Sequence, residues 1–451
     1  MDRDVVIVGA GVVGAAIARE LSRYRLAVTL LEAGPDVGAG TSKANTALLH
    51  TGFDAKPGTL EARLVARGYE LLSAYAPTVG IPVERTGALL VAWDDEQAAE
   101  LDGIVERSYA NGYRQIRRVS AQELYELEPS LGSGARGGLE VPGESLICPF
   151  TTPLAFATEA VLAGCDLRRE TAVTGVERLT RGGFRVSTNA GALTARRVVN
   201  AAGLRSDEVD RMLGFERFTV TPRRGELIVL DKLARPLVRH IILAVPTRVS
   251  KGVLVAPTVF GNVMVGPTAD DVLDKSDTSS TEAGLEHLRQ EGDRVVPRLL
   301  DFEVTAVYVG LRAATQHADF QIHFDEGYAC VGGVRSTGLS ASMAIAEHVR
   351  DGLGLELEAR TDLPRLRLPN IGEAFPRPYQ REDLIASDAE YGRIVCFCER
   401  VTRGELRDAF ASPLPPVDLD GLRRRTRAHM GRCQGFFCGA ALAAALRGRA
   451  G

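Results

Sequence analysis

Residues 5–14 have the sequence VVIVGAGVVG, and this stretch decides the fold of the chain. The first four residues form a continuous apolar run, long enough for one buried strand. Gly9, Gly11 and Gly14 follow at once in the pattern Gly-x-Gly-x-x-Gly, and apolar residues at helical spacing come next. A strand, a glycine turn and a helix in this order are the context in which the pattern binds a dinucleotide pyrophosphate.

Each position of this motif has a physical role. Gly9 allows a tight turn, Gly11 lets a pyrophosphate approach the backbone, and Gly14 lets the helix pack closely on the strand. The helix N-terminus adds free N–H groups and the positive end of a dipole. A second strand, 28–31, ends at Glu32, which is placed to accept a hydrogen bond from a ribose hydroxyl. The competing interpretation is a glycine turn that merely closes a strand–helix–strand unit, and the full context argues against it. The motif alone does not separate NAD from FAD.

Length and composition limit the class of protein. A chain of 451 residues is too long for one ordinary domain, so we expect two or three units. A hydrophobic content of 45% with 25% charged residues is typical of a soluble globular protein. The first strand begins almost at residue 1 and no apolar run reaches the length of a membrane span, which favours a cytoplasmic protein.

The charge is unevenly distributed along the chain. The net charge of −4 argues against nucleic acid as a partner. Residues 391–451 nevertheless hold eleven arginines against five acids, a local charge of +6. Seven cysteines in a cytoplasmic chain suggest metal or redox use rather than disulfides.

Periodicity and turn residues divide the chain into parts that alternate along the sequence. We expect a cofactor-binding part at about 1–80, 145–215 and 325–360, a mostly antiparallel substrate-binding part at about 81–144 and 216–324, a proline-marked linker at 361–390, and a small module at 391–451.

Several small and hydroxyl residues are candidates for contact with a large planar cofactor. They lie in a polar loop after the second strand, in a predicted strand pair, at the end of a buried strand and at the start of a second glycine-turn helix. They are Thr41, Ser42, Asn45, Thr46, Val173, Ala202, Gly203, Gly338 and Leu339. The second helix N-terminus is again a ready anion site. His50 follows the polar loop, and by itself such a histidine is more often a packed residue than a catalyst.

The last module contains two close cysteine pairs. Cys396 and Cys398 form the first, and Cys433 and Cys438 form the second. Four thiolates suit either zinc or a [2Fe–2S] cluster, and the spacing alone leaves both open. Association with a redox cofactor domain favours the cluster. Nearby arginines, at 423, 424, 425, 427 and 432, would offset the negative charge of a thiolate-bound cluster; the alternatives are a solvated face or a docking face for an acidic partner.

Longer stretches resemble a known family. VVIVGAGVVGAAIARELS at 5–22, TSKANTALLHTGFDAKPGTL at 41–60 and RSTGLSASMAIAEHV at 335–349 resemble the D-amino-acid-oxidase-like superfamily of FAD-dependent oxidoreductases. PRRGELIVLDK at 222–232 and YVGLRAA at 308–314 extend the similarity, which is closer to the A-subunit type of anaerobic glycerol-3-phosphate dehydrogenase. CFC and GRCQGFFC, which carry the four cysteines, resemble a bacterioferritin-associated-ferredoxin-like [2Fe–2S] module.

This resemblance implies an α/β fold with an FAD-binding Rossmann-type (glutathione-reductase-like) domain, an antiparallel-sheet substrate domain and a small α-helical iron–sulfur module. The implied cofactors are FAD and a [2Fe–2S] cluster. In such families a substrate C–H delivers hydride to the flavin. His50 would take the hydroxyl proton, and Arg312 and Arg335 would bind the substrate's phosphate or carboxylate. Arg224 is a weaker candidate, for which an ion pair is an equal alternative.

The resemblance also implies a reaction and partners. The leading hypothesis is a dehydrogenase that oxidises a small anionic secondary alcohol, first sn-glycerol 3-phosphate to dihydroxyacetone phosphate. Electrons would leave through the cluster to a partner electron-transfer subunit or a quinone-linked acceptor, with membrane association only through that partner. The alternatives are an L-2-hydroxyglutarate, other 2-hydroxy-acid or amino-acid dehydrogenase or oxidase, and a non-catalytic FAD and iron–sulfur subunit. A zinc-bound interaction module is the remaining alternative for the tail.

Overall fold

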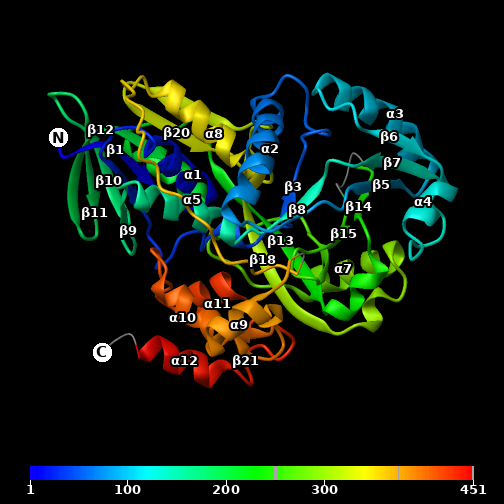
Figure 1. The fold of residues 1–451 in the computed structure, drawn as a ribbon. Helices are drawn as coiled ribbons and strands as arrows, with labels where there is room; N and C mark the ends of the chain where they lie inside the picture. The colour runs from blue at the N-terminus through cyan, green and yellow to red at the C-terminus, as the bar shows by residue number, and fades with distance from the viewer. Residues whose placement is uncertain (247–251, 374, 449–451) are drawn as a thin grey trace.

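Strand β1 (Arg3–Val8) lies inside a largely parallel sheet, as its continuous apolar run predicts. It pairs in parallel with β2 (Val28–Leu31) on one side and with β12 (Gly191–Asn200) on the other. The computed structural model describes residues 1–246, 252–373 and 375–448, and Figure 1 shows the arrangement of their elements. Within these residues the sheet has eight strands. The other five are β9 (Asp166–Arg168), β10 (Val173–Arg178), β11 (Phe184–Thr188), β19 (Gln321–Asp325) and β20 (Tyr328–Gly332).

The chain returns to this sheet from distant parts of the sequence, as expected. β20 pairs in parallel with the end of β12, and β10, β11 and β12 form an antiparallel meander. Helix α1 begins directly after the glycine turn and packs against two helices from later segments. These helices are α1 (Val12–Leu21), α5 (Thr151–Leu162) and α8 (Gly338–Gly352). The second glycine-turn helix, α8, therefore lies beside the first, and both begin at the same edge of the sheet (Figure 1).

A second sheet forms the other half of the large domain and has nine strands among the described residues. Its longest pair is antiparallel and joins β13 (Val220–Leu230) to β18 (Val304–Thr315) along almost their whole length. One pair, β5 with β14, is parallel, so the sheet is mostly but not wholly antiparallel. The remaining strands are β5 (Ala88–Ala92), β6 (Arg117–Val119), β7 (Gly137–Val141), β14 (Ile241–Ala244), β15 (Leu254–Pro257), β16 (Val263–Gly266) and β17 (Asp270–Asp271).

Four further helices flank the two sheets, and each begins after a residue whose side chain accepts a hydrogen bond from the first turn. Ser120 forms a complete capping box with Glu123, and Thr59 accepts a hydrogen bond from the Ala62 N–H. The four helices are α2 (Leu60–Val79), α3 (Asp95–Ala110), α4 (Ala121–Leu127) and α7 (Glu282–Val295). A short helix, α6 (Ser206–Met212), packs against the first sheet. Among the described residues, none of the helices combines the length and apolar character that a bilayer crossing requires.

A small three-stranded sheet brings the polar loop next to the middle of the chain. β8 (Ser145–Ile147) lies between β3 (Leu48–Leu49) and β4 (Val83–Glu84) and pairs antiparallel with both. His50 follows β3 directly and Glu144 precedes β8 directly. The antiparallel pairing of these two strands therefore places the two side chains at the same end of the small sheet.

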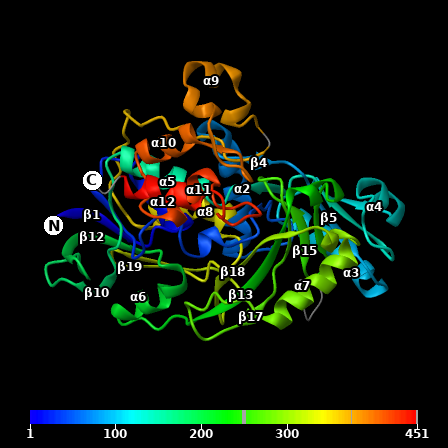
Figure 2. The same cartoon turned by 90° about the horizontal axis from the view of Figure 1, so that it is seen from below.

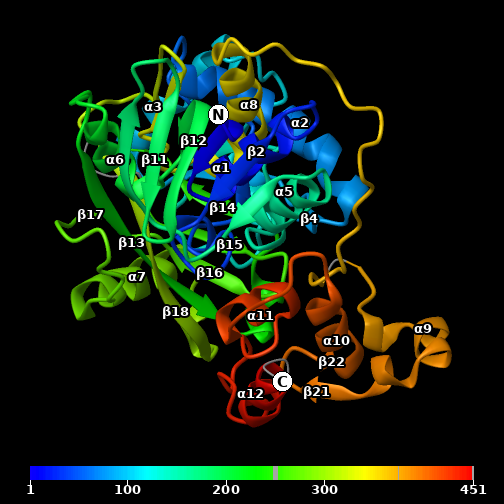
Figure 3. The same cartoon turned by 90° about the vertical axis from the view of Figure 1, so that its left-hand side faces the viewer.

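The C-terminal module forms its own small core. It contains β21 (Ile394–Cys396), β22 (Val401–Thr402), α10 (Arg403–Ala411), α11 (Leu419–Thr426) and α12 (Gly439–Arg447). Thr402 and Glu405 form the capping box that the sequence predicts at the start of α10. The predicted linker at 361–390 is only partly extended, because it ends in the short helix α9 (Glu382–Ser387), which packs beside the module. Figure 3 shows the extended part running from α8 down to α9.

The module is held against the cofactor domain by a buried ion cluster. Asp36, which lies just after β2, is fully buried. Arg425 donates to both of its carboxylate oxygens, at 2.6 and 2.9 Å, and Arg424 donates to one at 2.7 Å. Lys43 pairs with Asp420 of α11 at 2.9 Å. The views in Figures 2 and 3 agree that α11 lies next to the cofactor domain. Arg424 and Arg425 therefore make a docking contact inside the chain. From the sequence alone, these arginines are expected to offset the charge of a cluster, to form a solvated face or to bind an acidic partner.

Burial alone would raise the pKa of the Asp36 carboxyl, but the hydrogen bonds and charges of Arg425 and then Arg424 outweigh it and lower that pKa. The carboxylate's contribution to stability is therefore present in full above about pH 4 and is lost as the pH falls through the lowered value.

We expect Asp36→Asn to loosen the module from the cofactor domain. The substitution leaves Arg425 buried without its carboxylate, a defect that costs about 3–5 kcal/mol for buried pairs. Differential scanning calorimetry at neutral pH checks this by a lowered or split unfolding transition. Asp362→Asn is the matched control, because Asp362 pairs with Arg360 while 70% of its side chain is exposed. Equal transitions in both variants would contradict the role of the cluster.

Candidate functional site

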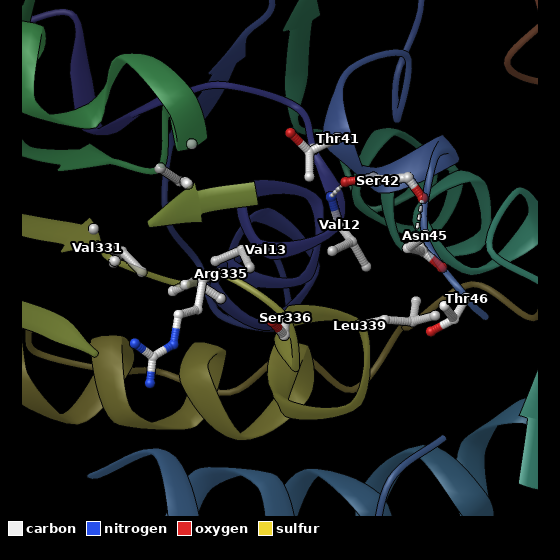
Figure 4. A pocket seen from close by; sticks show the side chains of 18 of the residues that line it. Val12, Val13, Thr41, Ser42, Asn45, Thr46, Val331, Arg335, Ser336 and Leu339 are labelled. Atoms are coloured by element: carbon white, nitrogen blue, oxygen red, sulfur yellow. Dashed lines mark hydrogen bonds between the residues drawn. The ribbon is translucent and has the colours of Figure 1, made fainter. Parts of the chain in front are cut away.

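A cavity opens where the glycine turn, the polar loop and the start of α8 meet. It contains about 850 Å³ of space not filled by protein atoms, with the open solvent at its mouth included. Ten of the residues predicted from the sequence line it, and Figure 4 shows several of them. They are Gly11, Thr41, Ser42, Asn45, Thr46, His50, Gly203, Arg335, Gly338 and Leu339. The structure thus brings together four segments that lie far apart in the sequence.

Six predicted residues do not line the cavity. They are Gly9, Gly14, Glu32, Val173, Ala202 and Arg312. Gly9 and Gly14 shape the turn instead, because a Cβ on Gly14 would lie 1.9 Å from the Gly9 carbonyl oxygen. Gly9 also has a φ of +98°, which favours glycine. Val173 and Ala202 pack against the hydrophobic core beside the sheet. Their assigned cofactor contacts remain predictions.

Two side chains hold the glycine turn in place by accepting hydrogen bonds from backbone N–H groups. The Glu32 carboxylate accepts from the Ala10 N–H and from the Gly34 N–H, both at 2.8 Å. Ser42 Oγ accepts from the Val12 N–H at 2.9 Å, at the start of α1 (Figure 4). Ser42 therefore lies at the positive end of this helix, where a phosphate group would also bind.

The structure adds a residue that the sequence did not identify. Glu144 is fully buried, and its Oε2 lies 2.9 Å from His50 Nδ1. Its Oε1 accepts from the Thr51 N–H at 2.6 Å and from the Thr51 hydroxyl at 2.8 Å. The His50 N–H donates to the buried Ser340 Oγ of α8 at 2.9 Å. The imidazole is thus fixed at the cavity wall, in the arrangement that acid–base residues use.

A weak signal for Glu144 exists in the sequence. An acid between Gly143 and the apolar residues after Ser145 is unusual at the start of a buried strand. Only the pairing of β3 with β8, however, shows that this acid faces His50.

The two predicted substrate arginines differ in their surroundings. Arg312, on β18, is half-buried and donates to the Thr268 carbonyl oxygen at 3.1 Å. No carboxylate of the described residues forms a salt bridge with it. Burial and nearby Arg223 lower its pKa, against the opposing charge of Asp270. Its neighbour Ala313 lines the cavity, whereas Arg312 itself does not. A partly desolvated guanidinium without a bound carboxylate suits an incoming anion.

Arg335 lies at the cavity rim with its guanidinium already engaged. It donates to the Ala318 carbonyl oxygen at 2.5 Å and lies 3.6 Å from a Glu61 oxygen. Figure 4 shows its side chain extending away from Ser42 and Asn45. The third arginine, Arg224, lies 3.6 Å from Glu226 and 3.7 Å from Asp277, which favours the ion-pair interpretation. Of these arginines, Arg335 lines the cavity, whereas Arg312 is the one that forms no salt bridge among the described residues.

The four predicted metal ligands lie together in two contacting pairs. The Cys398 thiol contacts Cys433, and Cys438 contacts Cys396. Backbone N–H groups, first that of Phe437, point to the Cys433 sulfur and lower its pKa. In the described part of the chain, no three or more His, Cys, Asp or Glu side chains already surround a position for one metal ion. Paired thiols fit the donor set of a binuclear cluster, which takes four thiolates.

Comparisons with known proteins match these two regions separately. The family of FAD dependent oxidoreductases matches residues 4–351, and the BFD-like [2Fe-2S] binding domain matches residues 394–447. These matches cover the large two-sheet domain and the cysteine module.

Individual relatives extend the similarity. A glycerol 3-phosphate dehydrogenase of Caloramator mitchellensis is 36% identical over 444 residues, covering 96% of this chain and 92% of that protein. A glycerol 3-phosphate oxidase of Mycoplasma pneumoniae is 32% identical over 76% of this chain and 92% of its own length. An L-2-hydroxyglutarate dehydrogenase of Indibacter alkaliphilus is 30% identical over 60% of this chain and 68% of its own length.

A solved structure has the same fold over most of the chain. The dithionite-reduced L-alpha-glycerophosphate oxidase of Mycoplasma pneumoniae, with FAD bound, superposes with a TM-score of 0.77 at 30% identity. It covers 81% of this chain and 99% of that one. The part it leaves uncovered is comparable in size to the cysteine module and the segment before it.

Proposed function

This chain belongs to the FAD-dependent oxidoreductase family and carries a BFD-like [2Fe–2S] binding domain, and on that basis we propose that it oxidises sn-glycerol 3-phosphate to dihydroxyacetone phosphate. Electrons would then pass through the cluster to a partner subunit or a quinone-linked acceptor. The single observation that carries the proposal is the His50–Glu144 pair in the wall of the cofactor cavity. The similarity to a glycerol 3-phosphate dehydrogenase over 96% of the chain supports the choice of substrate.

Two features of the cavity lining support FAD binding there. The backbone at Gly11 stays open, since a Cβ there would meet only Ser42 Oγ, at 3.2 Å. Gly338 and Leu339 at the start of α8 line the opposite part of the cavity, where a helix N-terminus favours negative charge. When bound, FAD accepts the hydride that the substrate's C–H bond releases. Proton transfer and substrate binding would depend on this chain's own side chains.

The His50–Glu144 pair is suited to take the hydroxyl proton of the substrate. A carboxylate only accepts hydrogen bonds, so the contact with Glu144 places the ring proton on Nδ1. Nε2 is then the ring nitrogen with the basic lone pair, and it would receive the proton as the C–H bond breaks. Glu144 also stabilises the positive charge that the ring gains in that step.

Arg312 would bind the phosphate of the substrate. A guanidinium binds phosphate or carboxylate oxygens through parallel hydrogen bonds. Among the described residues no carboxylate forms a salt bridge with Arg312, although the charge of Asp270 acts on it. Since both anions satisfy an arginine, Arg312 alone does not choose between glycerol 3-phosphate and a 2-hydroxy acid.

An anaerobic titration tests the proposed substrate. Purified FAD-loaded protein is mixed with sn-glycerol 3-phosphate, and the flavin absorption bands are followed. We expect them to bleach with glycerol 3-phosphate and to stay unchanged with L-2-hydroxyglutarate. If only L-2-hydroxyglutarate bleached the flavin, the proposed substrate would be wrong, whereas the fold and the proposed mechanism would be unaffected.

Glu144→Gln is expected to slow flavin reduction by about 10- to 100-fold without loss of FAD, as for other residues that orient a reacting group. The amide stabilises the protonated imidazole less than a carboxylate does. The acid limb of the pH profile of flavin reduction should therefore move to lower pH.

Stopped-flow reduction across pH measures both effects. Glu140→Gln is the matched control, because Glu140 lies on β7, just before the same turn, and pairs with Arg117. A rate and pH profile for Glu144→Gln equal to those of this control would contradict the assigned role.

A further inference from the structure

Three phenylalanines of the cysteine module are exposed to solvent. Phe397 and Phe437 are 70% exposed and Phe436 is 84% exposed. The rings of Phe436 and Phe437 pack edge to face with their centroids 5.2 Å apart. Phenylalanine is normally buried, and a group of exposed aromatic side chains marks a surface that another molecule covers.

These phenylalanines lie in the same two loops as the cysteines. Phe397 lies between Cys396 and Cys398, and Phe437 precedes Cys438. The contacts between Cys396 and Cys438 and between Cys398 and Cys433 bring the two loops together. Cys396 and Cys438 are each 1% exposed, whereas Cys398 and Cys433 are only half-buried. The sulfurs thus come closest to solvent in the loops that display the phenylalanines.

The exposed charged side chains of these two loops are arginines. Arg400 is exposed. Of the Arg432 side chain 47% is exposed, although it pairs with Asp231 and lies 3.6 Å from the exposed Glu303 of the large domain. The acid in this part, Glu399, is buried and paired with Arg427 and Lys232. We call Phe397, Phe436, Phe437, Arg400 and Arg432 the cluster face.

The cluster face differs from the side of the module that docks onto the cofactor domain. That side uses α11, whose Arg424 and Arg425 are buried against Asp36. In Figure 3, α11 lies next to the cofactor domain, while α12 and β21 lie at the far edge of the module. The loop of Arg432 and Gln434 also contacts the large domain, at Asp231 and the Thr305 carbonyl oxygen, yet the three phenylalanines stay exposed.

We propose that the cluster face is the docking surface for a one-electron carrier protein that presents acidic residues around its exposed redox group. The aromatic centre and arginine rim have the composition of protein interfaces, and the positive rim complements an acidic partner. This inference rests on the proposed function for its source of electrons. At each encounter one electron passes from the reduced cluster to the carrier's oxidised group, and no bond forms or breaks. Two encounters remove the two electrons of one substrate hydride.

The test compares carriers of opposite charge. Protein loaded with FAD and cluster is reduced with stoichiometric dithionite and mixed with soluble cytochrome b5, which is acidic, with cytochrome c, which is basic, or with ferricyanide. We expect cytochrome b5 to be reduced faster than cytochrome c, with a rate that falls as salt is added. Faster reduction of cytochrome c would overturn the charge assignment.

Variants test the aromatic centre. The double variant Phe436→Ser, Phe437→Ser should slow reduction of cytochrome b5 by about tenfold or more, as expected for central interface aromatics, and leave ferricyanide reduction unchanged. Binding of oxidised cytochrome b5, followed by its NMR chemical-shift changes at low and high salt, should weaken in parallel. Leu273→Ser is the control, because Leu273 is 98% exposed and lies outside the module.

Two further measurements keep the outcomes distinct. Phe436→Ser alone, which is not adjacent to a cysteine, replaces the double variant if the latter loses its iron and sulfide. Light scattering tests whether a second copy of the chain covers this surface. A dimer that the phenylalanine substitutions dissociate would overturn the proposal. Unchanged electron transfer from the variants to cytochrome b5 would also overturn it. Dithionite reduction makes the test independent of glycerol 3-phosphate, so failure of the proposed substrate leaves this result valid.

Discussion

His50→Ala is expected to slow the reduction of bound FAD by sn-glycerol 3-phosphate by about 10²–10⁴-fold, the usual contribution of a general base. The substitution removes the side chain that Glu144 holds in position at the cavity wall to take the hydroxyl proton in the proposed mechanism. The buried Glu144 carboxylate would keep its hydrogen bonds from Thr51. FAD should remain bound, because the glycine turn and Ser42 are unchanged.

Single-turnover stopped-flow measurements under anaerobic conditions separate this effect from product release. His323→Ala is the matched control, because His323 is partly buried on β19 and bonds to Gln321 away from the cavity. Normal flavin reduction in His50→Ala would contradict the catalytic assignment and favour a non-catalytic electron-transfer subunit. A spectrum without flavin would instead indicate a structural role for His50.

Gly11→Val is expected to abolish FAD retention while the protein still folds. Gly11 is the N-cap of α1, lines the cavity and has an ordinary φ of −67°, so a side chain there causes no backbone strain. Its Cβ would lie 3.2 Å from Ser42 Oγ, and the branched methyl groups would fill the space of the pyrophosphate. A clash of about 3 kcal/mol corresponds to a loss of affinity of about 100-fold or more.

The flavin-to-protein ratio after purification measures this loss, and circular dichroism checks the fold. Gly103→Val provides the control, because Gly103 lies within α3 and a Cβ there would meet no heavy atom within 4 Å. That variant should keep its FAD, and it should cost no helix stability, because valine is not less favourable than glycine inside a helix. A Gly11→Val protein that purifies with a full complement of flavin would contradict the placement of the pyrophosphate.

The sequence predicts well those features whose signals lie within a few residues of one another. The strand, glycine turn and helix at 5–21 form as expected, and so does the second strand before Glu32. In each case the apolar spacing and the turn residues that define the element lie within a few positions. The family, its FAD and its [2Fe–2S] domain follow from the resemblance of longer stretches to a known family and are confirmed by the comparisons.

Other features depend on residues that only the folded chain brings together. Glu144 reaches His50 because β8 pairs with β3, and a separation of 94 residues leaves no pattern in the sequence. Arg425 is 389 positions from Asp36, so the sequence shows a basic run without showing its buried acidic partner. The sequence predicts the same anion-binding role for Arg312 and Arg335. Only the groups that surround them in the folded chain distinguish the two.

The sequence by itself thus determined the fold class through local spacing, which encodes secondary structure and the glycine turn, and it determined the cofactors and the type of reaction through resemblance to a known family. Tertiary structure alone decided which carboxylate orients the histidine, which arginine forms no salt bridge among the described residues, and which face of the cysteine module stays exposed. The physical reason is that ion pairs and burial act through space, and the distance between two charges is fixed only when the strands and helices that carry them have packed together.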